Sequence, residues 1–307
     1  MVNPSGKMIV RRASGGGAVA VTAGASSSPP AIHAVAAKAP IPTSAAWVGG
    51  DDQAPTPTET APPPLARLTI IFPEGFTIRE MADRVAAVRA IAIGKRGVTP
   101  LLTRDGYLRA VDRAVAPPRF RKDMTRDSLE GFLFPASYEF TQRTTARELV
   151  ADQLRAFRQR FRTVNLSYAR SKNLTPYDVL IIASMIEKET AVPRERRLVA
   201  AVIYNRLRNR MPLGIDATVR YGLNIPGTES LTKAALRSKS PFNTRLRPGL
   251  PPTPIANPGL ASIRAAASPA AVDYLYYVRK PKSIAHYFTA NESDFLRKVC
   301  EYGYACD

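Results

Sequence analysis

The sequence has few of the residues that bind metals or form disulfides: its 307 residues include two cysteines and two histidines. Both cysteines, Cys300 and Cys306, lie at the C-terminal end. The sequence leaves open whether they close a small disulfide loop or stay free thiols. A zinc site is not expected, because no histidine or further cysteine stands beside them. A G-x-G-x-x-G or P-loop motif is also missing, so we expect neither a metal nor another cofactor.

Long apolar runs are missing too. No stretch approaches the roughly 18–20 apolar residues that a membrane-spanning helix needs. The small-residue run 18–25 is too short and too weakly apolar for a typical signal peptide. Residues 1–64 hold ten of the 27 prolines and show no sustained helical or strand period. This composition predicts a disordered Pro/Ala/Ser-rich tail over residues 1–64.

Acidic residues are scarce relative to basic ones: 44 Lys and Arg stand against 25 Asp and Glu, a net charge of +19. Such a charge favours polyanions, namely nucleic acid, anionic lipid or the anionic polymers of a cell wall. The charge does not choose among them, and an arginine-rich proteome would produce the same value. Because no recognition motif accompanies the charge, we expect no nucleic-acid partner.

From residue 65 onward the sequence predicts a mixture of short strands and helices. Residues 68–72 predict a strand, and 73–75 predict a turn. Thr77 and Glu80 have the spacing of a capping box and predict a helix start. Further expected elements are helices over 104–115 and 149–161, an aromatic edge strand within 130–140, an arginine-rich helix over 193–210, a loop-dominated region over 212–259 and a hairpin over 274–288. The aromatics of 130–140 suit either core packing or sugar stacking.

The strongest local signal is a buried helix that ends in acidic residues. Thr175 and Pro176 predict its start, and residues 179–186 are almost wholly apolar. The helix ends at Glu187 and Glu189. A carboxylate there is partly desolvated and lies near the negative end of the helix dipole, so its pKa should rise toward the range of a general acid. On these residues alone, two solvated helix-end charges are the alternative interpretation.

Several sequence blocks resemble one known family. The blocks are 183–190 (ASMIEKET), 195–196, 199–207, 211–213, 216–222, 240–244, 249–259 and 273–278, with a further match over 130–140 in which Ala136 replaces an acidic residue. In this order and spacing they resemble the endolytic murein transglycosylase family, whose domain is called YceG-like. The resemblance implies an α+β chain: a partial LysM-like and connecting region over 65–148, a mainly helical lysozyme-like catalytic domain with a β-hairpin over 149–298, and a C-terminal tail over 299–307.

The resemblance also implies a reaction. A lytic transglycosylase cleaves the MurNAc–GlcNAc β-1,4 bond of nascent glycan strands and leaves a 1,6-anhydroMurNAc end. The family's catalytic glutamate maps to Glu189, which would act first as acid and then as base. One carboxylate suffices because the nucleophile is the substrate's own 6-hydroxyl, whereas ordinary glycosidases use two carboxylates. The candidate substrate-binding residues are Glu187, Asp216, Thr218, Tyr221, Asn243 and Asn257. For the two asparagines a turn-forming role is the alternative.

The partners implied by the resemblance are peptidoglycan glycan strands and the wall-synthesis machinery, in the extracytoplasmic cell envelope. The family usually begins with a short cytoplasmic tail and one membrane-spanning helix, and neither is visible in this sequence. Two alternative functions remain: a catalytically silent wall-binding or scaffold protein, which the basic surface favours, and a hydrolytic muramidase.

Overall fold

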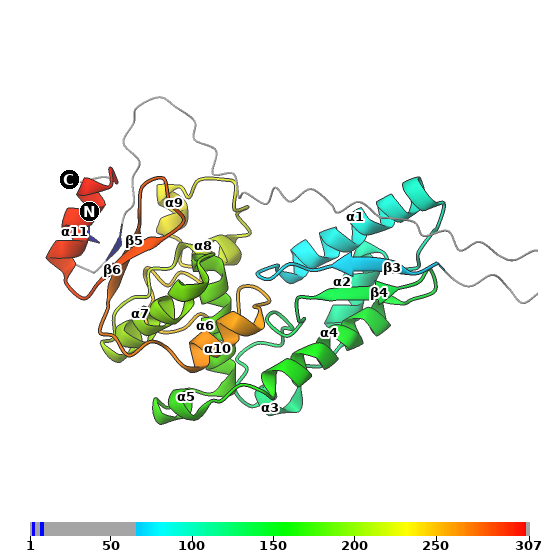
Figure 1. Ribbon diagram of the computed structural model, residues 1–307, viewed down its shortest axis with the longest axis horizontal. Helices are drawn as coiled ribbons and strands as arrows, with labels where there is room; N and C mark the ends of the chain where they lie inside the picture. The colour runs from blue at the N-terminus through cyan, green and yellow to red at the C-terminus, as the bar shows by residue number, and fades with distance from the viewer. Residues whose placement is uncertain (1, 4–6, 9–65, 305–307) are drawn as a thin grey trace, which may run out of the picture. The chain divides into compact units, whose positions relative to one another are not determined.

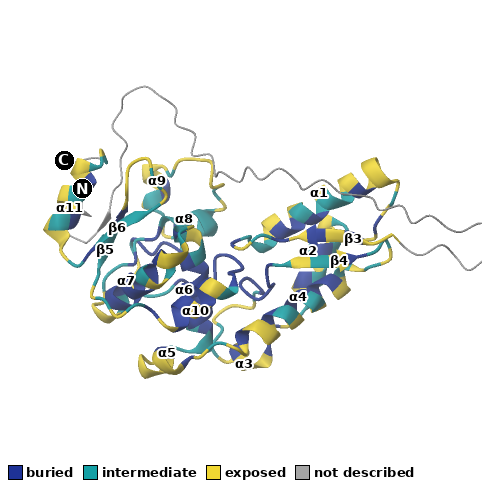
Figure 2. Ribbon diagram, viewed as in Figure 1, coloured by how far each residue is buried: buried dark blue, intermediate teal, exposed yellow. Residues whose placement is uncertain are grey.

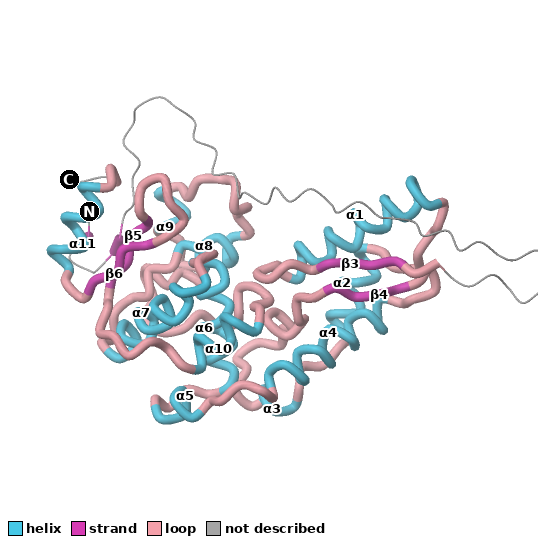
Figure 3. Tube along the Cα trace, in the orientation of Figure 1, coloured by secondary structure: helices cyan, strands magenta, loops and turns pink. Residues whose placement is uncertain are grey.

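The computed structural model describes residues 66–304 and two short strands near the N-terminus, β1 (Val2–Asn3) and β2 (Lys7–Met8), which pair antiparallel. The rest of the predicted tail over 1–64, and residues 305–307, lie outside the described residues. The described part is rich in helices and contains three two-stranded antiparallel sheets (Figures 1 and 3). The fold class is therefore α+β, as the sequence predicts.

The first half of the described chain is built on the sheet of β3 (Leu68–Ile71) and β4 (Ser137–Phe140), in which Leu68 pairs with Phe140. Leu68 and Ile70 are buried while their strand neighbours are exposed, so one face of the sheet packs on helices. The helices of this half are α1 (Ile78–Arg96), α2 (Arg104–Arg113), α3 (Pro118–Arg121) and α4 (Ala146–Phe161); α1 contacts β3, α2 packs between α1 and α4, and α3 contacts α6 (Pro176–Glu189). Helix α1 begins at the predicted capping box of Thr77 and Glu80.

The second half is organised around a buried helix, α6 (Pro176–Glu189). Helices α7 (Arg196–Arg208), α8 (Asp216–Leu223) and α10 (Leu260–Ala267) pack against α6, and Figure 2 shows α6 as buried over most of its length. The other elements are α5 (Ser167–Ser171), η1 (Pro193–Glu195), α9 (Lys233–Leu236), β5 (Tyr276–Arg279), β6 (His286–Thr289) and α11 (Glu292–Glu301). Strands β5 and β6 form the predicted hairpin.

The aromatic segment 130–140 differs in part from its prediction. Only residues 137–140 form a strand, and the preceding residues make a buried turn. Phe132 is fully buried, with its ring centroid 5.1 Å from that of Phe120 and 5.2 Å from that of Phe157. Phe134 is buried as well. Core packing is thus the role of these two rings.

Two further findings concern the C-terminal cysteines and the apolar character of the helices. Cys300, in α11, is disulfide-bonded; Cys306 lies outside the described residues. Within residues 66–304, no helix combines the length and the apolar character that crossing a membrane requires.

Candidate active site

Glu189 is the last residue of α6, and the sequence of that helix explains how it is held. Thr175 caps the helix by accepting a hydrogen bond from the backbone N–H of Asp178, whose carboxylate accepts one from the N–H of Thr175 in return. Between the cap and Glu187 the side chains are almost all buried. A rigid, buried helix therefore places Glu189 at its end, where the side chain is only half-buried.

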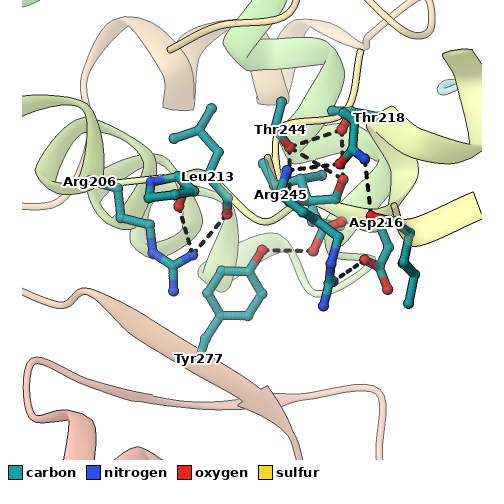
Figure 4. A network of polar contacts seen from close by, with 12 residues as sticks. Arg206, Leu213, Asp216, Thr218, Thr244, Arg245 and Tyr277 are labelled. Carbon is teal, nitrogen blue, oxygen red and sulfur yellow. Dashed lines mark hydrogen bonds and ion pairs between the residues drawn. The ribbon is translucent and has the colours of Figure 1, made fainter. Parts of the chain in front are cut away.

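Among residues 66–304, the carboxylate of Glu189 has one direct hydrogen-bond partner, a tyrosine of the hairpin. The Tyr277 hydroxyl donates a hydrogen bond of 2.7 Å to Glu189 Oε2, which is the dashed line that leaves the labelled Tyr277 in Figure 4. Burial raises the pKa of Glu189 to about 7; the Tyr277 hydrogen bond opposes that rise. Burial also raises the pKa of Tyr277 well above its usual value, so Tyr277 stays a donor.

An ion pair lies beside this carboxylate. Arg245 Nη1 contacts Asp216 Oδ1, and the two side chains lie next to each other in Figure 4. The Arg245 side chain is only 4% exposed, whereas that of Asp216, the first residue of α8, is 46% exposed. The negative charge of Asp216 raises the pKa of Glu189 further, and the positive charge of Arg245 lowers it. Arg245 Nη2 is buried without a hydrogen-bond partner among the residues that the structure describes.

A second buried arginine, Arg206 of α7, also acts on the site. Its Nε donates to the carbonyl of Leu275 at 2.6 Å, and its Nη1 donates to that of Leu213 at 2.8 Å. Its guanidinium carbon lies 5.4 Å from the ring centroid of Tyr276. Burial lowers the pKa of Arg206 from its usual value, and its positive charge lowers that of Glu189. Arg206 therefore ties the hairpin to α7 next to the glutamate.

Similarity to known proteins covers the whole of this site. A model of the YceG-like family matches residues 58–301, which include every residue of the site described so far. The chain belongs to the YceG-like family. A protein named endolytic murein transglycosylase from Streptococcus pneumoniae is 33% identical over 272 residues, which are 83% of this chain and 46% of the relative.

Two further proteins are similar to this YceG-like chain. A Bacillus subtilis protein of the same name is 36% identical over 161 residues, 52% of the chain and 44% of the relative. The chain thus spans less than half the length of these curated relatives, 46% and 44%. A crystal structure from Listeria monocytogenes, of a protein described as YceG-like, has a TM-score of 0.61, 28% identity and 75% coverage of both chains.

Glu187 points away from Glu189 in this YceG-like protein. Its Oε2 accepts a hydrogen bond of 2.9 Å from the backbone N–H of Gly259, which caps α10, and its Oε1 lies 3.6 Å from Arg196 Nη2. Burial raises the pKa of the nearby Glu74, and the charge of Glu187 adds to the rise. The two glutamates at the end of α6 therefore contact different parts of the protein: Glu187 contacts the start of α10, and Glu189 contacts the hairpin.

Thr218 and Asn243 shape the loop that carries Arg245. The hydroxyl of Thr218 is 2.9 Å from that of Thr244. Asn243 Oδ1 accepts a hydrogen bond of 3.1 Å from the backbone N–H of Arg245, and its Nδ2 donates to the carbonyls of residues 236 and 238. Both predicted site residues are buried and act within the protein, close to the site but not on Glu189. The contacts of Asn243 are those of a residue that holds a turn, and its substrate-binding role stays a prediction.

Asn257 and Tyr221 meet at a different carboxylate, Glu130. Asn257 Nδ2 donates to Glu130 Oε1 at 2.8 Å, and the Tyr221 hydroxyl donates to Glu130 Oε2 at 3.1 Å. Asn257 Oδ1 accepts from the backbone N–H groups of Gly131 and Leu133, each at 2.9 Å. Burial raises the pKa of Glu130 to about 8. These contacts join the two halves of the described chain.

Sequence reasoning missed three residues that surround Glu189: Tyr277, Arg206 and Arg245. All three lie within or next to the blocks that resemble the family, yet each comes from a different element. A buried arginine has the same sequence signal as a solvated one, and the hydrogen bond from Tyr277 to Glu189 depends on how the hairpin packs against α6. Their convergence on one carboxylate is a property of the tertiary structure.

Proposed function

We propose that this chain is an endolytic lytic transglycosylase of peptidoglycan. It would cleave the MurNAc–GlcNAc β-1,4 bond of nascent glycan strands and leave a 1,6-anhydroMurNAc end. The observation that carries the proposal is Glu189, a carboxyl group whose pKa burial raises to about 7 and whose one direct partner among the described residues is the Tyr277 hydroxyl. The names of the two curated relatives support the same reaction.

In this mechanism Glu189 serves both steps. Its protonated form gives the proton to the glycosidic oxygen as the bond from MurNAc C1 to that oxygen breaks. The resulting carboxylate then takes the proton of the MurNAc 6-hydroxyl, whose oxygen bonds to C1 and closes the anhydro ring. A pKa of about 7 suits both steps, since the two forms of Glu189 are similar in free energy near neutral pH.

The neighbouring charges adjust that balance. Asp216 favours the protonated acid that the first step needs, because its negative charge raises the pKa of Glu189. Arg206 and Arg245 favour the carboxylate that forms between the steps, because their positive charges lower the same pKa. The Tyr277 hydrogen bond also favours the carboxylate. We assign these four residues to the tuning of the acid/base group.

One observation favours a second function, a hydrolytic muramidase. Asp216 is partly exposed, and its charge acts on Glu189, so it is a candidate for the second carboxylate that hydrolysis requires. Its ion pair with Arg245 argues against this role, because the pair already engages one of its two oxygens. Glu187 is a weaker candidate, since it accepts a hydrogen bond from Gly259.

The arrangement of modules is part of the same proposal. Residues 65–148 would form a partial LysM-like and connecting region, and 149–298 a lysozyme-like catalytic domain with a β-hairpin. The antiparallel pair β3–β4 with its packed helices supports the first assignment, and the buried helix α6 ending in Glu189 supports the second. The proposed partners are peptidoglycan glycan strands and the wall-synthesis machinery, in the extracytoplasmic cell envelope.

The mass of the product ends tests the reaction. Purified protein is incubated with isolated sacculi and with soluble uncrosslinked glycan, and the released fragments are analysed by mass spectrometry. A transglycosylase gives anhydro ends, which lack the molecule of water that hydrolysis adds. Hydrated ends would identify a muramidase, and intact substrate would favour a wall-binding or scaffold protein.

A further inference from the structure

A buried acid and the sole histidine of residues 66–304 form a pair that the proposed reaction does not use. Glu195, the last residue of η1, accepts a hydrogen bond of 2.9 Å from the backbone N–H of His286 and lies 2.7 Å from its Nδ1. The side chains are 5% and 10% exposed. An ionised carboxylate only accepts hydrogen bonds, so its contact with Nδ1 assigns a proton to that nitrogen. Together with the bond from the backbone N–H, this contact fixes the plane of the His286 ring.

The His286 ring in turn contacts the tyrosine that holds Glu189. The rings of His286 and Tyr277 are nearly perpendicular, at 87°, with centroids 5.4 Å apart. In the hairpin, Tyr277 pairs with Phe288, so His286 lies two residues along the partner strand and on the same face as Tyr277. The Phe288 ring also contacts Tyr277, at 5.6 Å between centroids. The position of Tyr277 is thus fixed by ring contacts with His286 and Phe288 as well as by the hydrogen bond of its hydroxyl.

The contacts of Glu195, His286 and Tyr277 lead back to Glu189 through one further residue. Thr190 follows Glu189 directly, and its hydroxyl donates to Glu195 Oε2 at 3.3 Å. Glu195 holds His286, whose ring packs on Tyr277, and Tyr277 returns to Glu189 through its 2.7 Å hydrogen bond. All five of these residues are buried or half-buried. The end of α6, the helix η1 and the hairpin are therefore positioned against one another by five residues.

We propose that His286, held by Glu195, is a positioning residue that fixes the Tyr277 ring and thereby selects Oε2 of Glu189 as the oxygen that receives the tyrosine hydrogen bond. This inference rests on the proposed function, in which Glu189 is the acid/base group. With Oε2 engaged, Oε1 is the oxygen left to exchange the proton with the substrate. Loss of His286 frees the Tyr277 ring, and Glu189 loses the orientation set by its donor.

A double-mutant cycle tests the proposal. Tyr277→Phe removes the donor, which lowers kcat on soluble glycan and moves the alkaline limb of its pH profile up by about one unit, because a hydrogen bond to a charged group is worth about that much. His286→Ala moves kcat and the limb in the same direction. In the Tyr277→Phe background, His286→Ala changes kcat by less than about twofold and moves the limb by less than about 0.3 pH unit, since both residues act through one contact.

The matched control is Tyr287→Phe. Tyr287 is the next residue of β6, and its hydroxyl donates to Asp294 at 2.6 Å, away from Glu189. This variant keeps wild-type kcat and the wild-type pH profile. If His286→Ala fails to fold, His286→Asn keeps an N–H toward Glu195 and shows the same shift on a smaller scale.

A nuclear magnetic resonance measurement tests the pair without any activity. The chain has two histidines, so the spectrum contains two sets of ring signals, and those of His286 are assigned with the His286→Asn variant. In the wild type, neutral His286 carries its proton on Nδ1, and Glu195→Gln lowers the population of that tautomer. A proton on Nε2 in the wild type would overturn the proposal.

The outcomes separate the inference from the function on which it rests. A wild-type protein that produces no anhydro ends contradicts the proposed function, whatever the tautomer of His286. An active wild type whose His286→Ala variant keeps the wild-type alkaline limb, while Tyr277→Phe shifts it, contradicts the positioning role alone. Additive effects of the two substitutions contradict it too, because they would mean that His286 acts by another route.

Discussion

Asn257 donates a hydrogen bond of 2.8 Å to the carboxylate of Glu130, which lies 127 residues earlier in the chain. Glu130 belongs to the segment that joins α3 to β4, and Asn257 precedes α10 of the second half. Asn257 also accepts hydrogen bonds from two backbone N–H groups that follow Glu130. A single amide side chain therefore supplies hydrogen-bond partners to backbone groups that have none from regular secondary structure. We expect this contact to contribute strongly to the stability of the fold beside α6.

Asn257→Ala should therefore be strongly destabilising. The substitution leaves the buried N–H groups of Gly131 and Leu133 without an acceptor, and each such loss costs about 1–3 kcal/mol. We expect a loss of ~3 kcal/mol or more in the free energy of unfolding, measured by denaturant titration. Asn224→Ala, at the C-cap of α8, is the matched control and should cost less. Equal costs would contradict the role given to Asn257.

Glu130→Gln should change how stability depends on pH. Burial raises the pKa of Glu130 to about 8, above its ordinary value of 4.5, so the folded state favours the protonated acid. The contribution of this group to stability is fully present below the ordinary pKa and is lost as the pH rises through about 8. The difference in melting temperature between wild type and Glu130→Gln should shift in favour of the variant between pH 5 and pH 9. A pH-independent difference would contradict this assignment.

Asp216→Asn should lower the pKa of Glu189. The substitution removes a negative charge that raises this pKa and leaves the positive charge of Arg245 unopposed. Since the first step needs protonated Glu189, the alkaline limb of the kcat profile should move to lower pH while activity persists at pH 5. Complete loss of activity across the pH range would instead support Asp216 as the second carboxylate of a muramidase.

Gly259→Ala should disturb the end of α6 that carries Glu187. A Cβ at this position would lie 1.8 Å from Glu74 Oε1, so the Glu74 side chain or the start of α10 must move. We expect a destabilisation of ~1–3 kcal/mol by denaturant titration. Gly94→Ala is the matched control: a Cβ there would have no neighbour within 4 Å, and Ala in a helix should stabilise the protein by up to ~1 kcal/mol. A neutral Gly259→Ala would show that the contact yields without cost.

The helices and strands with strong local signals could be predicted from the sequence. The capping boxes at Thr77 and Thr175, the apolar run of α6 and the alternating hairpin residues each determine structure over a few residues. Helix α10 was not predicted, because it begins at Gly259 without a side-chain cap and follows a proline-rich loop. Helices α8 and α9 lie inside the region predicted to be mainly loop and are short, which leaves little periodicity to detect.

For the site, too, local features could be predicted from the sequence and contacts between distant segments could not. The position of Glu189 at the end of a buried helix, and the upward direction of its pKa, could be predicted from α6 alone. The surroundings of Glu189 contributed by Tyr277, Arg206 and Arg245 could not, because these residues come from segments far apart in the sequence and meet only in the tertiary structure. Tyr221 and Asn257, which the resemblance assigns to substrate binding, both contact Glu130, and their role toward a substrate stays a prediction.

The central claim is that Glu189 alone supplies the acid and the base. Its most direct test compares Glu189→Gln with the matched Glu187→Gln, two positions away, on soluble glycan, by mass spectrometry of released anhydro ends. Glu189→Gln should lower the rate by at least about 10²–10⁴-fold, the usual contribution of a general acid, with an unchanged melting temperature. Glu187→Gln should keep most of the activity, because Glu187 accepts a hydrogen bond from Gly259 rather than facing Glu189. Near-wild-type release of anhydro ends by Glu189→Gln, or a larger loss in Glu187→Gln, would contradict the account.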